Sequence, residues 1–166
     1  MKSSVRRSLL GGFVAFAVVG GCNQPTAPLP REGPPDDLSF MYGGFGIDIV
    51  RVELQGASVA MWRRPWDWRP GVPIDTMRAV PTDDAWREFW LAAERAGVHR
   101  WRTQYVAEGV VDGDGWALRL VTGDFDLLAS GSNAFPDARG REHELEMTEE
   151  FRLLRTAIGN LVGEEL

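Results

Sequence analysis

The sequence has a single cysteine, Cys22, and only two histidines, His99 and His143, among its 166 residues. One thiol cannot form a disulfide within the chain, so packing alone has to stabilise the fold. Two histidines without a second cysteine leave too few ligands for a zinc site. The apolar stretch from Leu9 to Gly21 has 13 residues. As a helix it would span about 20 Å, short of the ~30 Å hydrocarbon core of a bilayer, so a stable membrane span is not expected.

Lysine is almost absent, and acidic residues are in excess. Lys2 is the only lysine, and all 24 acidic residues follow Cys22, together with 15 arginines. The chain after residue 21 therefore carries a formal charge of 15 minus 24, or −9. Proteins that bind nucleic acid or anionic membrane surfaces need a basic face. The charge argues against nucleic acid as a partner.

The first 22 residues have the order of a secretory leader, with basic residues, an apolar stretch and then small residues. Lys2, Arg6 and Arg7 supply the charge, and Val19-Gly20-Gly21-Cys22 ends the stretch. These last four residues resemble the lipobox of bacterial lipoproteins. The resemblance implies that the leader is cut before Cys22, that its sulfur is diacylated and that the new amino end is acylated. Several acyl chains make such an anchor effectively permanent.

The residue after the cysteine bears on the location of the protein. Asn23 stands where the resemblance places aspartate for retention in the inner membrane. This favours a lipid-anchored protein of the outer membrane that faces the periplasm. The alternative is an ordinary cleaved leader with an incidental cysteine.

The chain divides into three segments. Residues 1–21 are predicted to be the signal peptide. Residues 22–37 hold the lipidated cysteine and five prolines, a composition typical of an extended, disordered tether. Residues 38–166 have the length of one domain with its own core.

Alternation of apolar and polar residues predicts strands over residues 38–42, 50–55, 57–62, 100–105, 116–121 and 125–130. Helices are predicted to start at Thr82 or Asp83 and at Thr148, where a polar cap precedes apolar residues at helical spacing. Four prolines predict irregular structure over residues 63–81. The element order is β-β-β-α-β-β-β-α. We therefore expect an α+β domain with a single antiparallel sheet of five to six strands and both helices on one face.

The sequence predicts no catalytic centre, no metal site and no cofactor. It contains no G-x-S-x-G pattern for a nucleophile on a strained turn. Asp112 and Asp114 could gather with Asp124 and Asp126 across a hairpin as oxygen ligands. The calcium-binding loop pattern fails, however, because Trp116 occupies its fifth position.

The segment from residue 62 to 70 holds three of the seven tryptophans and three arginines. Exposed tryptophan and arginine are the side chains most enriched in binding hot spots, and aromatic faces can also stack on sugars. We select Trp66, Trp68 and Arg69 as candidate contacts for a protein or glycan ligand in the cell envelope. The alternative is a lid of rings folded over the sheet, with arginine stacked on tryptophan.

Two short motifs in the second half of the chain resemble a bacterial family of small uncharacterised domains. The motifs are Asp112-Gly113-Asp114-Gly115-Trp116-Ala117-Leu118, a DG-x-x-W-x-L strand, and Gly131-Ser132-Asn133-Ala134-Phe135-Pro136, a G-S-N-x-[YF]-P loop. The resemblance covers residues 105–162, with residues 137–147 as an insertion. It implies a small α+β domain without an assigned activity. Ser132, Asn133 and Phe135 are further candidate contacts, and a structural corner is the alternative.

These observations predict a noncatalytic, membrane-tethered domain of the envelope with a binding or structural role. One alternative is an inhibitor of a cationic hydrolase that attacks the envelope, since the acidic charge would steer such an enzyme. The other is a hydrolase that uses a carboxylate pair, for instance Asp84 and Glu88 on the first predicted helix.

Overall fold

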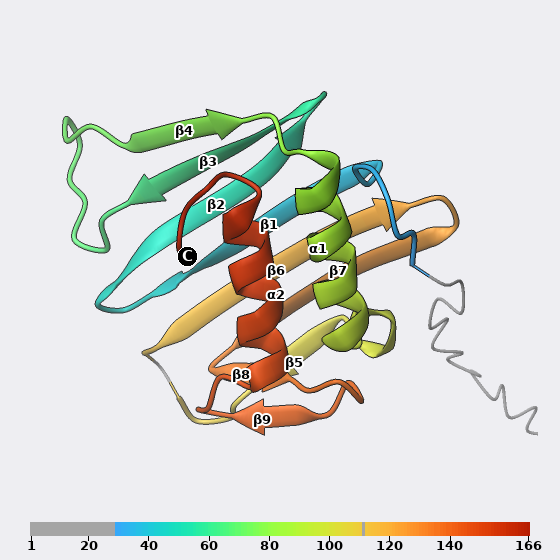
Figure 1. The fold of residues 1–166 in the computed structure, drawn as a ribbon. Coiled ribbons are helices and arrows are strands. Elements are labelled where there is room, and N and C mark those ends of the chain that lie inside the picture. Colours follow the sequence, from blue (N-terminus) through green and yellow to red (C-terminus); the bar gives the residue numbers. More distant parts are fainter. Residues whose placement is uncertain (1–28, 111) are drawn as a thin grey trace, which may run out of the picture.

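The computed structural model describes residues 29–110 and 112–166 (Figure 1). The strands are β1 (Asp37–Gly44), β2 (Ile47–Gln55), β3 (Ser58–Arg64), β4 (Asp75–Ala79), β5 (Gln104–Val106), β6 (Asp114–Thr122), β7 (Phe125–Ser132), β8 (Ala134–Pro136) and β9 (Glu142–Glu144). The helices are α1 (Asp83–Arg95), α2 (Glu149–Asn160) and the short 3-10 helix η1 (Val98–Arg100).

Seven strands form one large sheet in the order β4-β3-β2-β1-β6-β7-β5, and β8 pairs with β9 in a second, two-stranded sheet. All pairs in the large sheet are antiparallel except β5 with β7. Helices α1 and α2 lie side by side across one face of the large sheet (Figure 1). The predicted α+β class with both helices on one face is confirmed.

The number and order of the strands differ from the prediction of one sheet with five to six strands. Strand β4 lies inside the stretch predicted to be irregular, between Pro73 and Pro81. It forms the edge of the sheet, where neighbouring prolines interrupt no central ladder. Strands β8 and β9 have three residues each, too few for alternation to reveal them.

The strand predicted over residues 100–105 is also wrong in extent. Gly97 adopts a left-handed conformation (φ 69°) after α1, and η1 follows it. Only β5 pairs with the sheet, in parallel with β7, from Gln104 opposite Ser130 to Val106 opposite Ser132. A parallel pair of three residues leaves no periodic signal in the sequence.

The core lies between the large sheet and the two helices. Alternate residues of the central strands face the helices, as in β1, where Leu38, Phe40 and Tyr42 are buried. This is the period of two expected for a sheet covered on one face. The helices contribute Trp86, Phe89, Trp90 and Ala93 from α1 and Phe151, Leu154 and Ile158 from α2.

Both helix starts agree with the predicted caps. The Thr82 hydroxyl accepts a hydrogen bond from Ala85 N at 3.2 Å, and the Thr148 hydroxyl accepts one from Phe151 N at 3.2 Å. Acidic residues occupy the first turn of each helix, where they favour the positive end of the helix dipole.

Residues 29–36, within the predicted tether, lie against the domain. Leu29 packs on the core, Pro35 is buried, and the Trp90 indole donates to the Gly33 carbonyl at 2.8 Å. The Asp36 carboxylate accepts from Gly123 N at 2.8 Å, in the turn between β6 and β7. The chain therefore enters the domain at the end of the sheet that carries this turn. The predicted leader, Cys22 and the remaining residues of the tether lie outside the described residues.

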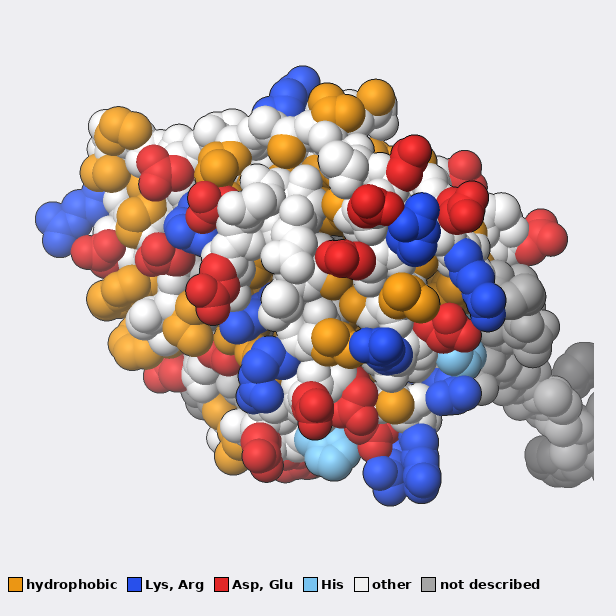
Figure 2. Space-filling model, in the orientation of Figure 1, with side chains coloured by type: hydrophobic (Ala, Val, Ile, Leu, Met, Phe, Trp, Pro, Cys, Tyr) orange, Lys and Arg blue, Asp and Glu red, His pale blue; other side chains and the backbone are white. Residues whose placement is uncertain are grey.

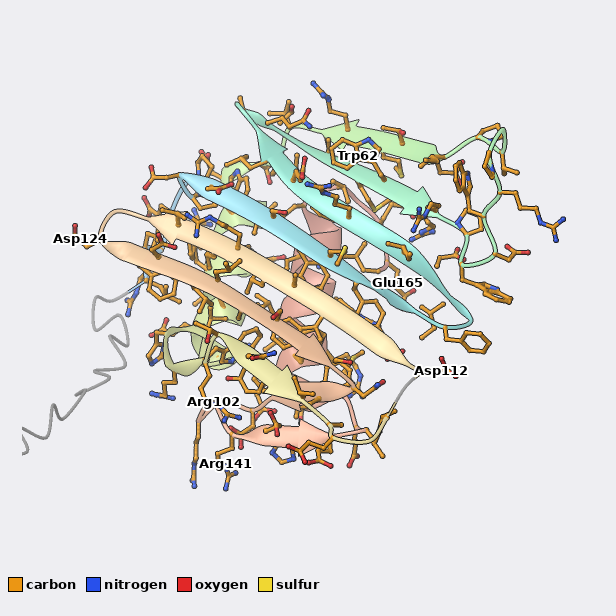
Figure 3. The ribbon with its side chains drawn as sticks, turned by 180° about the vertical axis from the view of Figure 1, so that it is seen from behind. Trp62, Arg102, Asp112, Asp124, Arg141 and Glu165 are labelled. Carbon is orange, nitrogen blue, oxygen red and sulfur yellow. The ribbon has the colours of Figure 1, made fainter. Side chains whose placement is uncertain are left out.

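No helix of the described part covers the other face of the large sheet (Figure 3). This face carries a mixture of small, charged and apolar side chains, among them Met41, Trp62, Ala117 and Leu128. Within residues 29–110 and 112–166, none of the helices combines the length and hydropathy required to cross a bilayer.

Candidate functional site

Two loops meet at one end of the large sheet and place aromatic rings in solvent. Phe45 lies in the turn between β1 and β2, and Trp66 lies in the loop between β3 and β4. Their ring centroids are 5.6 Å apart and the rings are tilted by 55°. Phe45 is 69% exposed and Trp66 is 52% exposed. We refer to Phe45, Trp66 and the neighbouring Trp68 as the aromatic cluster.

The loop that carries Trp66 and Trp68 has a defined conformation. Trp68 N donates to the Pro65 carbonyl at 3.0 Å, and Val72 N donates to the Arg69 carbonyl at 3.1 Å. The Trp68 indole donates to the Val72 carbonyl at 2.8 Å. These bonds close two successive turns, so the loop backbone and the Trp68 ring are held in place before any ligand arrives.

An arginine connects this loop to the sheet. The guanidinium of Arg64 lies 5.7 Å from the centroid of the Trp68 ring, within the range of a cation–π interaction. The lid alternative predicted such stacking of arginine on tryptophan. Trp68 is half-buried by its surroundings, whereas Trp66 projects into solvent. The structure therefore combines the fixed ring of Trp68 with the exposed ring of Trp66.

A groove on the uncovered face of the sheet adjoins the aromatic cluster. It has a volume of about 420 Å³, and Arg64 lines it as well as contacting Trp68. Arg51 and Glu53 form an ion pair along one of its walls. Its other lining residues are Met41, Ile49, Trp62 and Ile74. Figure 3 shows Trp62 on the face of the sheet away from the helices.

The loop that carries the tryptophans is locally basic, although Asp48, Asp75 and Asp112 also lie at this end of the molecule. Residues 62–70 contain three arginines and one aspartate, a local charge of +2. Arg69 is exposed, and Arg63 donates to the Glu165 carbonyl at 2.8 Å, which ties the C-terminal residues to β3. In Figure 2 hydrophobic side chains gather on the left of the molecule, over the β3–β4 loop and the β1–β2 turn.

The second set of predicted contacts lies in the connection from β7 to β8. Ser132 is exposed, but Asn133 and Phe135 are 7% and 2% exposed. Asn133 has a left-handed backbone (φ 53°), and its side-chain oxygen accepts from Asp114 N at 2.8 Å. Phe135 packs edge-on against Phe151, with centroids 5.0 Å apart. Asn133 and Phe135 therefore support the fold and do not present their side chains to a ligand.

The two sets of predicted contacts lie at the same end of the sheet without meeting. Phe45 N donates to the Gly113 carbonyl at 3.2 Å, which joins the β1–β2 turn to the turn before β6. Asn133 holds that second turn from its other side. The bonds of Asn133 to this turn go to the backbone of Asp112 and Asp114.

The two motifs of the family resemblance contact each other. The Trp116 indole donates to the Ala134 carbonyl at 2.9 Å and passes over Gly131, where a Cβ would lie 2.1 Å from the indole nitrogen. A Cβ on Gly113 would lie 1.9 Å from the side-chain oxygen of Asn133. Gly113 and Gly131 are thus required by close packing between the two motifs.

A buried phenol lies next to the turn before β6. Tyr42 donates to the Asp114 carboxylate at 2.7 Å, and the guanidinium of Arg155 lies 4.9 Å from its ring centroid. Burial and the hydrogen bond to Asp114 raise the pKa of Tyr42 above its usual range. The phenol therefore remains neutral and links β1, β6 and α2.

A buried carboxylate in the β8–β9 hairpin has no counterpart among the sequence-based predictions. Asp137 is 6% exposed and accepts from Arg139 N at 2.8 Å, Arg141 N at 2.9 Å and Arg141 Nε at 2.7 Å. His143 Nε2 lies 3.3 Å from the same carboxylate. Burial alone would raise the pKa of Asp137, but these hydrogen bonds outweigh it and hold the pKa well below its usual range.

This Asp137–His143 pair has no suitable nucleophile among the groups that contact it. The nearby Thr148 hydroxyl donates to the Pro136 carbonyl at 2.5 Å and caps α2. We infer that the hydrogen bonds of Asp137 stabilise the conformation of the β8–β9 hairpin.

The aspartates considered as oxygen ligands do not gather. Asp112 and Asp124 lie at opposite ends of the β6–β7 pair (Figure 3). Within the described residues no group of three or more His, Cys, Asp or Glu side chains is placed to hold a metal ion. Asp84 and Glu88 line an open groove beside α2 together with Glu164 and Glu165, and Asp84 pairs with Arg87.

Comparison of the chain with protein-family models, with curated proteins and with solved structures finds no match.

Proposed function

We propose that the chain is a lipid-anchored, noncatalytic domain of the cell envelope that binds a ligand through the aromatic cluster and the adjoining groove. The observation that carries this proposal is the exposure of Phe45 and Trp66 in a domain most of whose other aromatic rings form its core. Solvent exposure of two adjacent rings gives the folded domain little stability, because their apolar surface stays in water.

The composition of the surface supports binding. Aromatic rings and arginine are the side chains that contribute most to interface energies. Here they occupy two loops fixed by hydrogen bonds, so little conformational freedom has to be lost when a ligand binds. The groove extends the contact area from the loops onto the face of the sheet.

The anchor has its own test. The proposal requires that the mature chain begins at Cys22 and carries acyl chains on its sulfur and amino end. Mass spectrometry of the protein extracted from membranes gives the mass of the N-terminal peptide directly. A Cys22→Ser variant is the control, because it offers no sulfur to acylate. An N-terminal peptide with an unmodified thiol from the wild-type chain would contradict lipid anchoring.

In-cell photo-crosslinking tests the binding surface with the full chain in place. A benzophenone amino acid is introduced at position 66, at position 45 or at position 145. Leu145 is a matched control, since it is 68% exposed, as Phe45 is 69%, but lies in the connection from β9 to α2. We expect adducts of higher mass from positions 66 and 45 and none from position 145.

A fourth probe separates the alternatives. Thr156 lines the acidic groove on the helix side of the molecule. Adducts from position 156 with none from positions 45 and 66 would replace the proposal with a basic partner, as the inhibitor alternative requires. Equal adducts from all four positions would indicate nonspecific contact and would also contradict the proposed surface.

A further inference from the structure

We propose that the ligand of the aromatic cluster is an anionic glycan, a chain of sugar rings that carry carboxylates, located away from the membrane to which the protein is anchored. This inference rests on the proposed function and specifies the chemistry of its ligand. It is carried by the geometry of the rings, the local charge and the position of the cluster relative to the start of the domain.

The rings offer two faces at an angle. Phe45 and Trp66 are tilted by 55° with centroids 5.6 Å apart, so their exposed faces are not coplanar. The C–H bonds on one side of a pyranose ring carry partial positive charge and fit the negative face of an aromatic ring. Two tilted faces suit successive rings of a glycan, whose planes rotate along the chain.

Polar residues flank the tryptophans of the loop in the sequence. Asp67 and Arg69 are exposed on either side of Trp68, and Arg64 lies over the Trp68 ring. Sugar hydroxyls need donors and acceptors beside the stacking surface, because a polar group loses free energy when it is desolvated without a partner. An apolar helix of a protein partner would leave the same groups unpaired.

The arginines of the loop favour a carboxylate-bearing polymer. Residues 62–70 carry +2, whereas the chain after residue 21 carries −9. At physiological ionic strength the screening length is about 8 Å, so distant acidic residues weaken this local attraction little. Arginine binds carboxylate through two parallel N–H···O bonds. Because Asp48, Asp75 and Asp112 lie at the same end, the attraction depends on direct pairing with the exposed Arg69 and its neighbouring arginines, not on the net charge of this end.

The position of the cluster argues against the bilayer as its ligand. Asp36 contacts the β6–β7 turn, and the Phe45 backbone contacts the turn at the opposite end of β6. Strand β6 has nine residues, which at ~3.3 Å each separate the two ends by about 30 Å. Figure 1 shows the described chain beginning on the right, beside α1, and the β3–β4 loop on the left.

The length of the chain between Cys22 and Leu29 limits how the domain can be oriented relative to the bilayer. Leu29 follows Cys22 by seven positions, and at no more than ~3.6 Å per position this stretch spans at most about 25 Å. If Cys22 is acylated, the distance from Leu29 to the bilayer is therefore smaller than the length of the sheet. This short reach favours an orientation in which the aromatic cluster, at the far end of the sheet, lies away from the bilayer.

Binding of defined probes to the processed full chain in detergent tests this inference. The probes are oligogalacturonate, which carries a carboxylate on each ring, chitooligosaccharide of similar length, which is neutral, and phosphatidylglycerol vesicles. We expect the oligogalacturonate to bind. Trp66→Ala and Phe45→Ala should each weaken it about tenfold or more, as for aromatic hot spots. The matched control Leu145→Ala should leave it unchanged.

The charge is tested separately. Arg69→Gln should weaken oligogalacturonate binding several-fold without affecting the weaker binding of chitooligosaccharide, and added salt should have the same effect. Unchanged thermal unfolding of each variant shows that it is folded. Equal binding of oligogalacturonate and chitooligosaccharide by the wild-type chain would show that the carboxylates are not recognised and would overturn the inference of an anionic ligand.

The outcomes separate this inference from the proposed function. Protease-sensitive adducts at position 66 in cells, without binding of either sugar, would overturn the glycan and leave a protein-binding surface. Vesicle binding that Trp66→Ala abolishes would assign the cluster to a membrane instead. Adducts that resist protease and disappear after glycan hydrolysis would support the inference, and absence of any adduct would overturn both proposals.

Discussion

The indole of Trp116 and the backbone of Gly131 lie in direct contact across the β6–β7 pair, as cross-strand partners in the register of the sheet. The indole donates to the Ala134 carbonyl beyond Gly131 at 2.9 Å. A side chain at position 131 would occupy the space of the indole nitrogen. The contact fixes the path from β7 to β8.

We expect Gly131→Ala to lower the free energy of unfolding by about 3 kcal/mol, because the indole has to move and lose its hydrogen bond in a closely packed core. Urea unfolding monitored by tryptophan fluorescence measures the change. Gly115→Ala is the matched control, since it neighbours Trp116 but its nearest atoms lie 3.7 Å away. Similar losses for both variants would contradict the proposed contact.

The Asp137 carboxylate should make stability depend on acid. Its folded pKa is lowered, so it stabilises the fold above the unfolded pKa of about 4, and this contribution is lost as the pH falls below that value. We expect Asp137→Asn to cost about 2 kcal/mol at pH 7, through weakened hydrogen bonds of a buried group. The variant should also lose less stability than wild type between pH 4 and 2.

Unfolding curves at several pH values check this prediction. Asp124→Asn is the control, since Asp124 is exposed in the β6–β7 turn. A parallel decline of wild type and Asp137→Asn below pH 4 would show that other carboxylates determine the acid sensitivity.

The hydrogen bond from Trp90 to the Gly33 carbonyl should protect the start of the domain. Trp90→Phe keeps an aromatic ring but removes this donor, whose bond is worth about 1 kcal/mol. We expect cleavage by trypsin after Arg31 to accelerate about fivefold, through easier local opening. Limited digestion followed by mass spectrometry measures the rate. Trp68→Phe, which removes an indole donor at the other end of the molecule, should leave it unchanged.

Trp66 should contribute little to stability. The ring is half exposed, and we expect Trp66→Ala to lower the free energy of unfolding by less than about 1 kcal/mol. Phe151 provides the contrast, since it is 1% exposed and contacts the rings of Tyr42, Trp116 and Phe135. Phe151→Ala should cost about 4 kcal/mol. Thermal unfolding compares the two, and a large loss for Trp66→Ala would show that the loop serves as a structural lid.

Local chemistry made much of the fold predictable. Threonine caps and helical spacing located α1 and α2, and alternation located the long strands. Strand β4 was missed because its five residues lie between prolines and show no buried face. The short strands β5, β8 and β9 form through tertiary pairing, which no local pattern records.

In the candidate site, too, some residues could be predicted from local sequence and others depend on tertiary contacts. Composition alone selected Trp66, Trp68 and Arg69, since a loop rich in tryptophan and arginine is unusual. Phe45 was not selected, although a large apolar residue in a glycine-rich turn is a usable signal. Its approach to Trp66 depends on the register that places the β1–β2 turn beside the β3–β4 loop. Asn133 and Phe135 are polar and apolar residues of one loop, and only the path of the chain decides that both are buried.

The central position of β1 affects how the chain reaches its native state. Strand β1 pairs on one side with β2, which follows it at once, and on the other with β6, some seventy residues later. The meander from β1 to β4 can assemble early, but one flank of its first strand stays unsatisfied until β6 is synthesised. Such contacts between distant parts of a chain slow folding and leave an open edge for association with other chains. A nascent chain truncated before residue 114 should therefore be the species most prone to aggregate and most dependent on chaperones.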